Sequence, residues 1–173
     1  MRLVRIACVL ALAVTSYGQP PPDVAAQREA MKKLAFLVGK WSGEAVVIRG
    51  PGGPLKVLQT EDVQYKLNGL VLLVEGTGRN PATGDLVFNA LAAISYDDAA
   101  RTYRFRSYND GRYLDTDLKV SGDGFEWGYK ADTATVRFVM HLNEQGEWTE
   151  IGEVTIGNTA PRKMLEMTVR PQK

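Results

Sequence analysis

The 173-residue chain is poor in the residue types that build metal centres and covalent frameworks, since it contains one cysteine and one histidine. A single cysteine excludes a disulfide framework and every site with several thiolates, and a single histidine excludes every multi-histidine metal site. The charge is nearly balanced, with 21 Lys+Arg, 20 Asp+Glu and a formal net charge of +1. We therefore expect no metal, no cofactor and no nucleic-acid partner.

The chain also lacks an apolar run long enough to span a bilayer. Its N-terminal run covers only residues 6–14, follows Arg2 and Arg5, and precedes small residues that end at Gly18. This order of charged, apolar and small residues is typical of a secretory signal peptide, here residues 1–18. Cleavage would leave 155 residues without cysteine, with 19 basic and 20 acidic side chains. We expect an exported protein, periplasmic or extracellular, with no membrane span in the mature chain.

Residues 19–38 are predicted to form an extended leader and one short helix. Three consecutive prolines at 20–22 favour an extended segment, and Asp23 is a suitable N-cap for a helix that runs through Phe36. The apolar residues expected on one face of this helix are Val24, Met31, Leu34 and Ala35.

From Gly39 onward, runs of about ten residues rich in β-branched and aromatic side chains alternate with turn residues. Nine turns delimit ten strands, and no helix-length segment separates them, which excludes parallel βαβ units. An antiparallel meander of this size must protect its edges, and closure removes the edges completely. The sequence thus predicts an all-β fold in which a ten-stranded antiparallel meander over residues 39–173 closes into a barrel.

Hairpin turns predict which residues of neighbouring strands lie opposite one another. A two-residue loop at Asp110-Gly111 pairs two arginines of one strand with two aspartates of the next, so that opposite charges face each other. Two-residue loops at Asn68-Gly69 and Asp132-Thr133, and a four-residue loop at residues 121–124, continue the alternation. Successive hairpins agree on which face is apolar.

That face defines a predicted interior with many aromatic side chains. Ten strands enclose more space than eight, so we expect a cavity in preference to a fully packed core. The aromatic residues predicted inside are Tyr65, Phe88, Tyr96, Tyr103, Phe105, Phe125, Trp127, Tyr129 and Phe138. The polar residues predicted inside are Glu61, Ser107 and Glu153, the last from strands whose connecting loop is poorly defined by the sequence.

The segment Leu37 to Glu44 contains the pattern Gly39-x-Trp41-x-Gly43 at the start of the first strand. A Gly-x-Trp after a short helix resembles the opening of calycin barrels, which include lipocalins, fatty-acid-binding proteins and nitrobindins, and the longer form is most similar to nitrobindins. Residues 34–170 also resemble a bacterial family of unknown function in that neighbourhood. The pieces that carry this likeness are Glu75-Gly76, residues 93–97, residues 103–108 and residues 125–128. The resemblance implies a calycin-like barrel and, by analogy, small-molecule binding.

Nitrobindins hold haem through a histidine near the end of the barrel, and the present chain departs from that pattern. The last predicted strand, residues 162–170, contains no histidine. The one histidine, His141, lies on the same side of its predicted strand as Arg137 and Val139, and this side is predicted to face outward. We therefore expect no haem ligation.

The predicted ligand site combines aromatic faces with a few polar groups, a composition typical of small-molecule pockets. Carboxyl and hydroxyl groups would orient a polar head, while the aromatic faces would hold an apolar body. The predicted ligand-binding residues are Trp41, Glu61, Tyr65, Tyr103, Phe105, Trp127, Tyr129 and Phe138. No residue is assigned a catalytic or metal-binding role.

Three functions remain open at the level of sequence. The first is an exported, non-enzymatic barrel that binds an apolar or amphiphilic small molecule. The second is an isomerase or hydrolase that uses internal tyrosines and paired carboxyls such as Glu61 and Glu153, whose pKa burial would raise. The third is an envelope interaction protein with a packed core.

Overall fold

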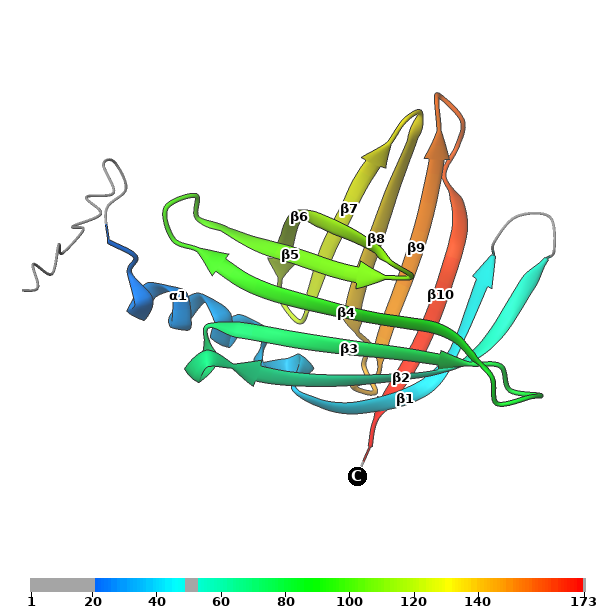
Figure 1. The fold of residues 1–173 in the computed structure, drawn as a ribbon, viewed down its shortest axis with the longest axis horizontal. Coiled ribbons are helices and arrows are strands. Elements are labelled where there is room, and N and C mark those ends of the chain that lie inside the picture. Colours follow the sequence, from blue (N-terminus) through cyan, green and yellow to red (C-terminus); the bar gives the residue numbers. More distant parts are fainter. Residues whose placement is uncertain (1–20, 49–52, 173) are drawn as a thin grey trace, which may run out of the picture.

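The computed structural model describes residues 21–48 and 53–172, in which ten antiparallel strands close into one barrel (Figure 1). The strands follow one another in meander order, and β1 pairs with β10 to complete the closure. The predicted all-β class and ten-stranded barrel are thereby confirmed. The bounds are β1 Gly39–Ile48, β2 Pro54–Lys66, β3 Val71–Arg79, β4 Leu86–Asp97, β5 Thr102–Asn109, β6 Arg112–Ser121, β7 Gly124–Ala131, β8 Ala134–Leu142, β9 Trp148–Ile156 and β10 Arg162–Pro171.

The two halves of the barrel run in different directions in Figure 1, where β3, β4 and β5 cross the view and β7 to β10 rise steeply through it. The proposed signal peptide, residues 1–18, lies outside the described residues. In the part of the chain that the structure covers, no helix is long and apolar enough to cross a membrane.

The strand register predicted from the turns is confirmed in the centre of the meander. Trp127 lies opposite Leu118 on one side and Phe138 on the other. The hairpin turn between β5 and β6 has positive φ at Asp110 (50°) and Gly111 (74°), which a two-residue turn of this hand requires. The predicted charged ladder is present on the outer face, with ion pairs of 2.8 Å from Arg104 to Asp117 and from Arg106 to Asp115.

Two loops differ in length from the prediction while the register stays the same. The β2–β3 connection covers four residues, because Leu67–Gly69 forms a 3-10 turn and Lys66 pairs with Val71. The β6–β7 connection is shorter than expected, since Ser121 pairs directly with Gly124. Each loop changes by one residue on both sides of the turn, so the residues that face each other are unchanged.

The N-terminal helix begins at the predicted residue and changes from an α-helix to a 3-10 helix. Asp23 caps α1 (Val24–Met31) by accepting a hydrogen bond of 2.9 Å from the amide of Ala26. The chain continues as the 3-10 helix η1 (Lys32–Leu37), whose three-residue turn places side chains at every third position on one line. The fully buried residues of this line are Met31, Leu34 and Leu37. The prediction that Val24 and Ala35 share the buried face is wrong, because both are exposed.

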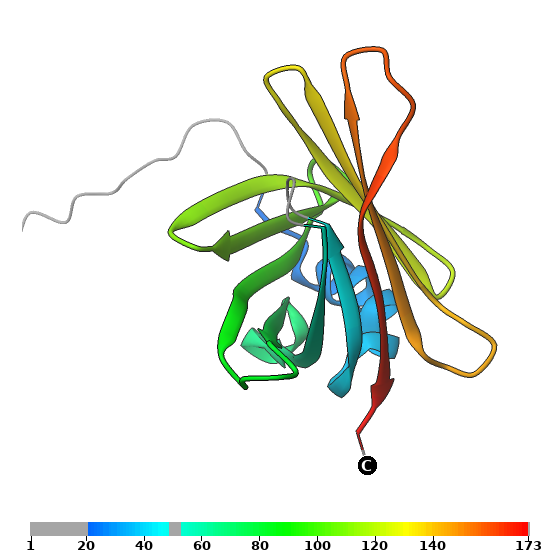
Figure 2. The ribbon, with the colours of Figure 1, turned by 90° about the vertical axis from the view of Figure 1, so that its right-hand side faces the viewer.

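This helical segment covers one end of the barrel, which we call the closed end. Figure 2 shows it at the far side of the molecule, behind the strands. Asp98 in the β4–β5 turn accepts hydrogen bonds of 2.7 Å from the amide of Asp23 and from the side chain of Gln27. Arg28 donates to the carbonyl of Asn68 in the β2–β3 loop. The helix is therefore tied to two of the hairpin loops that it covers.

Candidate functional site: a cavity in the open half of the barrel

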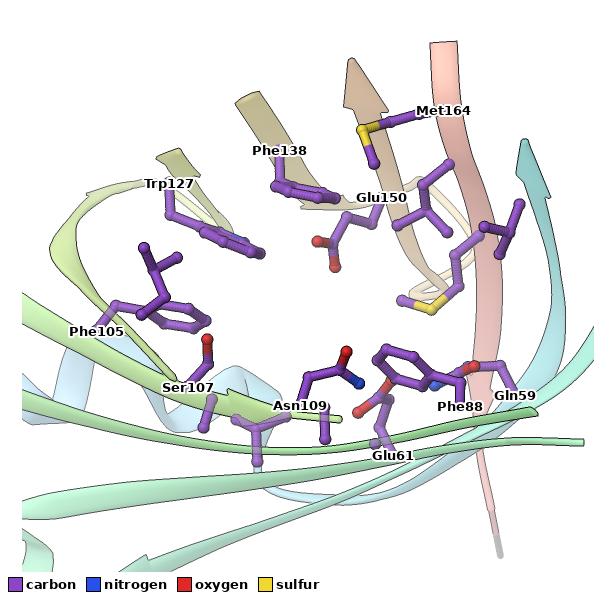
Figure 3. A pocket seen from close by; sticks show the side chains of 18 of the residues that line it. Gln59, Glu61, Phe88, Phe105, Ser107, Asn109, Trp127, Phe138, Glu150 and Met164 are labelled. Atoms are coloured by element: carbon purple, nitrogen blue, oxygen red, sulfur yellow. The ribbon is translucent and has the colours of Figure 1, made fainter. Parts of the chain in front are cut away.

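The barrel encloses a cavity of about 640 Å³ between the closed end and the opposite, open end. Its wall is contributed by strands from all around the barrel, and Figure 3 shows their side chains converging on an empty centre. Lining residues near the open end are exposed, notably Tyr113 (74%) and Leu55 (41%). The volume lies within the range of small-molecule pockets.

One wall of the cavity is a stack of aromatic rings. The ring of Trp127 lies 4.2 Å from that of Phe138 at an angle of 11°, and 4.5 Å from that of Phe105 at 26°. Tyr129 continues the series at 6.5 Å from Trp127. The strands hold these residues at inward-facing positions, so that the stacked rings together form an apolar wall of the cavity.

Glu61 of β2 carries one of two buried carboxyl groups in this wall. Its Oε1 accepts a hydrogen bond of 2.8 Å from Gln59 Nε2, and the side chain is 8% exposed. The carboxyl lies over Gly76 of β3, where a Cβ atom would approach Oε2 to 2.8 Å, so a side chain there would displace it. Burial raises the pKa of Glu61 to about 8, and the charge of Glu150 adds to this, while the Gln59 hydrogen bond opposes it.

Glu150 of β9 carries the second buried carboxyl group. It is also 8% exposed, and its Oε2 accepts a hydrogen bond of 3.2 Å from Trp148 Nε1. Burial raises the pKa of Glu150 to about 7, against the effect of hydrogen bonds from the side chains of Trp148 and Trp127. Two carboxyl groups therefore titrate near neutral pH in one apolar cavity.

The prediction that Glu153 is the second internal carboxyl is wrong. A two-residue loop at Gln145-Gly146 would place Glu153 opposite the inward-facing Phe138. The actual connection has five residues, closed by hydrogen bonds from the amides of Gln145 and Glu147 to Asn143 Oδ1. This odd number shifts the parity of β9, so Glu153 pairs with Arg137 on the outer face and Glu150 takes the inner position.

The eight predicted ligand-binding residues divide between two regions. Five of them line the cavity, namely Glu61, Phe105, Trp127, Tyr129 and Phe138. The other three lie at the closed end. The Tyr65 and Tyr103 hydroxyls donate to the carbonyls of Met31 (2.5 Å) and Ala30 (2.7 Å), and Trp41 Nε1 donates to Leu37 O (2.8 Å). These three side chains hold the helical segment in place, and burial raises the pKa of both tyrosines.

Several polar residues of the cavity were missed by the sequence reasoning. Gln59 and Asn109 line it, and Figure 3 shows the Asn109 amide pointing into it beside Ser107. Gln59 lies two positions before Glu61 on the same strand, so simple alternation predicts its inward direction. Prediction of the inward position of Glu150 would have required the length of the β8–β9 loop, which no turn signal in the sequence specifies.

His141 does not meet the requirements of a haem ligand in the barrel. It is exposed on the outer face, and its Nε2 lies 3.1 Å from Thr149 Oγ1. Among residues 21–48 and 53–172, no group of three or more His, Cys, Asp or Glu side chains is arranged to hold a metal ion. The polar and aromatic groups that line the cavity are two carboxyl groups, amides, hydroxyls, aromatic rings and, at the open end, the guanidinium of Arg112.

Comparison with known proteins supports the fold and no more. No protein-family model matches the chain, and no curated protein does. Fifteen solved chains match by structure. One is the crystal structure of Rv2717c from M. tuberculosis, with 14% sequence identity, a TM-score of 0.63, and coverage of 83% of this chain and 98% of that one. At this identity the likeness shows a shared barrel architecture.

Proposed function

We propose that the protein is an exported, non-enzymatic barrel that binds an apolar or amphiphilic small molecule in its interior. The observation that carries the proposal is the cavity of about 640 Å³, walled by stacked aromatic rings and a few buried polar groups. Ligand pockets combine a large apolar lining with a small number of polar groups that orient the ligand. An open cavity of this size does not favour the alternative of a packed interaction module.

We also propose kinship with calycin barrels of the lipocalin and nitrobindin type. The Gly39-x-Trp41-x-Gly43 pattern supports this, because each of its last two members has a structural role here. Trp41 packs at the closed end, edge-on to Trp148, and a Cβ at position 43 would lie 2.1 Å from the carbonyl oxygen of Thr168 on β10. Gly43 thus allows β1 to pair closely with β10, and Trp41 fills the closed end of the barrel.

Export is proposed from the N-terminal pattern of residues 1–18. Intact-mass analysis of material from the native host is expected to give a chain that starts at Gln19 and lies in the periplasm or medium. A cytoplasmic chain that retains Met1 to Gly18 would contradict export and leave the cavity proposal untouched.

Binding can be tested with Nile red, a neutral dye whose fluorescence rises in apolar surroundings. Ala90 and Leu91 are neighbours on β4, but Ala90 lines the cavity whereas Leu91 is exposed on the outer face. We expect saturable dye uptake by the wild type, its loss in Ala90→Trp, which fills the cavity, and its retention in Leu91→Trp. Absence of uptake by the wild type, or equal uptake by both variants, would overturn the proposal.

A second function is favoured by one observation, the two internal carboxyls with raised pKa. Such a pair suits general acid–base catalysis by an isomerase or hydrolase. Turnover of a bound ligand with a bell-shaped pH profile that is lost in Glu61→Gln would establish this alternative.

A further inference from the structure

We propose that the ligand is an amphiphilic amine, whose ammonium head lies between Glu61 and Glu150 and whose apolar body lies against the Phe105–Trp127–Phe138 stack. This inference rests on the proposed binding function and names its ligand class. It follows from how the two carboxyls are held, from the charges that surround them, and from the aromatic wall beside them.

The protein uses only part of the hydrogen-bonding capacity of each carboxyl. Gln59 donates to Oε1 of Glu61, and Glu61 Oε2 accepts no hydrogen bond within the described residues. Glu150 accepts from Trp148 Nε1 at Oε2, and the Trp127 side chain also donates to this carboxyl. Figure 3 shows the two carboxyl groups reaching into the cavity from different strands. A carboxylate has about four lone-pair sites, so Glu61 with one donor and Glu150 with two both keep acceptor capacity for a donor that enters the barrel.

The charges on the cavity wall favour a cation. Its titratable or charged lining groups, over the described ranges, are Glu61 from β2, Arg112 and Tyr113 from β6, Tyr129 from β7 and Glu150 from β9. Arg112 is exposed and lies at the start of β6, beside the open end, where water screens its charge. A carboxylate ligand would add a third acid to the buried pair, whereas an ammonium group would neutralise one of them.

The aromatic wall suits the apolar body of the same ligand. The rings of Phe105 and Phe138 stack on the two sides of Trp127, at 4.5 Å and 4.2 Å, and the three rings together form an apolar wall for an alkyl or aryl body. A primary ammonium supplies three N–H donors, enough to donate to both carboxyl groups.

Binding of such a ligand must release protons from the protein. The pKa of both carboxyls is raised by burial, so part of the pair is protonated at neutral pH. A primary ammonium, with a pKa of about 10.4 like that of lysine, keeps its own proton. Pairing it with a carboxylate favours the ionised acid, and the displaced proton goes to the buffer. Affinity for the amine should therefore rise with pH until the carboxyls are ionised.

The test compares decylammonium, decanol and decanoate, which share one chain and differ in the head. Their affinities are measured by calorimetry from pH 6 to 9, in two buffers with different enthalpies of ionisation. At pH 8.5 we expect decylammonium to bind at least about tenfold more tightly than decanol, since hydrogen bonds to charged groups are the stronger ones. We expect its binding to release protons at pH 6.5, and decanoate binding to weaken as pH rises.

Matched variants separate the carboxyls from general surface charge. Glu61→Gln/Glu150→Gln keeps the shape of both side chains and should remove the advantage of decylammonium, together with its proton release. Glu153→Gln, on the outer face of the same strand as Glu150, should leave both unchanged. Retained Nile red uptake in the double variant would show that its cavity is intact.

The outcomes distinguish this inference from the proposed function. If Nile red binds but decylammonium binds no more tightly than decanol, the amine proposal fails and the binding barrel stands. Unchanged amine affinity in the double variant would also overturn it. If Nile red and all three decyl compounds fail to bind, the proposed function itself fails.

Discussion

The two ends of the barrel use their inward-facing polar groups for different purposes. At the closed end, the polar atoms of Tyr65, Tyr103 and Trp41 are each directed to a backbone carbonyl of the helical segment. In the open half, Glu61 and Glu150 are buried, and their carboxyl groups reach into the cavity. Polar groups that are fully paired within the protein stabilise a fold, whereas buried carboxyls that keep unused acceptor sites are available to a ligand.

The apolar packing differs in the same way. Met31, Leu34 and Leu37 are fully buried beneath the strands at the closed end. The aromatic stack in the open half has protein on one side and the cavity on the other. We therefore expect substitutions at the closed end to act mainly on folding, and those in the open half mainly on binding and on pH dependence.

The largest effect on stability is expected from Leu34→Ala. Removal of this fully buried side chain should lower the free energy of unfolding by about 2–5 kcal/mol, because it leaves a void beneath the helix. Leu55→Ala, at the exposed rim of the open end, is the matched control and should cost less than about 1 kcal/mol. Chemical denaturation measures both. Equal losses would contradict the distinction between the two ends.

The second effect is the pH dependence of stability that Glu61 imposes. Below its ordinary pKa of 4.5 the carboxyl is protonated in both states, and between 4.5 and about 8 only the folded state keeps the proton. Wild-type stability should therefore fall as pH rises through this window, by up to about 1.4 kcal/mol per pH unit from this group, and then level off. Glu61→Gln should remove that part of the fall. Identical pH profiles for the two proteins would show that Glu61 is not perturbed.

A smaller loss of stability is expected from Trp127→Ala, because an edge of the indole already faces the cavity. The loss of two stacked contacts should cost about 1–3 kcal/mol, while Nile red uptake should fall strongly. Unfolding curves and dye titrations on the same sample separate the two effects. Destabilisation as large as that of Leu34→Ala, with dye uptake preserved, would place Trp127 in the packed core.

The smallest effect is expected from Tyr103→Phe. This change removes one hydroxyl and leaves the carbonyl of Ala30 without that donor, which should cost about 0.5–1.5 kcal/mol. Affinity for Nile red should be unchanged, because Tyr103 lies outside the cavity wall. Tyr113→Phe, at the exposed rim, should leave stability unchanged. A loss of dye binding in Tyr103→Phe would extend the site into the closed end.

Loop length explains where the sequence predicted the interior correctly and where it did not. The loops at residues 67–70 and 122–123 differ from the prediction by two residues each, which preserves the inward and outward faces. The β8–β9 loop has five residues, and that odd number exchanges the faces of β9. The inward positions of Phe105, Trp127 and Phe138 were therefore predictable, whereas that of Glu150 was not.

Local sequence determined the ten strands, most turns, the N-cap at Asp23 and the aromatic face, because alternation and turn preferences act between near neighbours. Only the tertiary structure decided that the helical segment covers one end, that Tyr65, Tyr103 and Trp41 serve it, and that Glu61 and Glu150 share a cavity. Those features depend on contacts between residues far apart in the chain. The raised pKa of each carboxyl likewise depends on the desolvation that closure of the whole barrel produces.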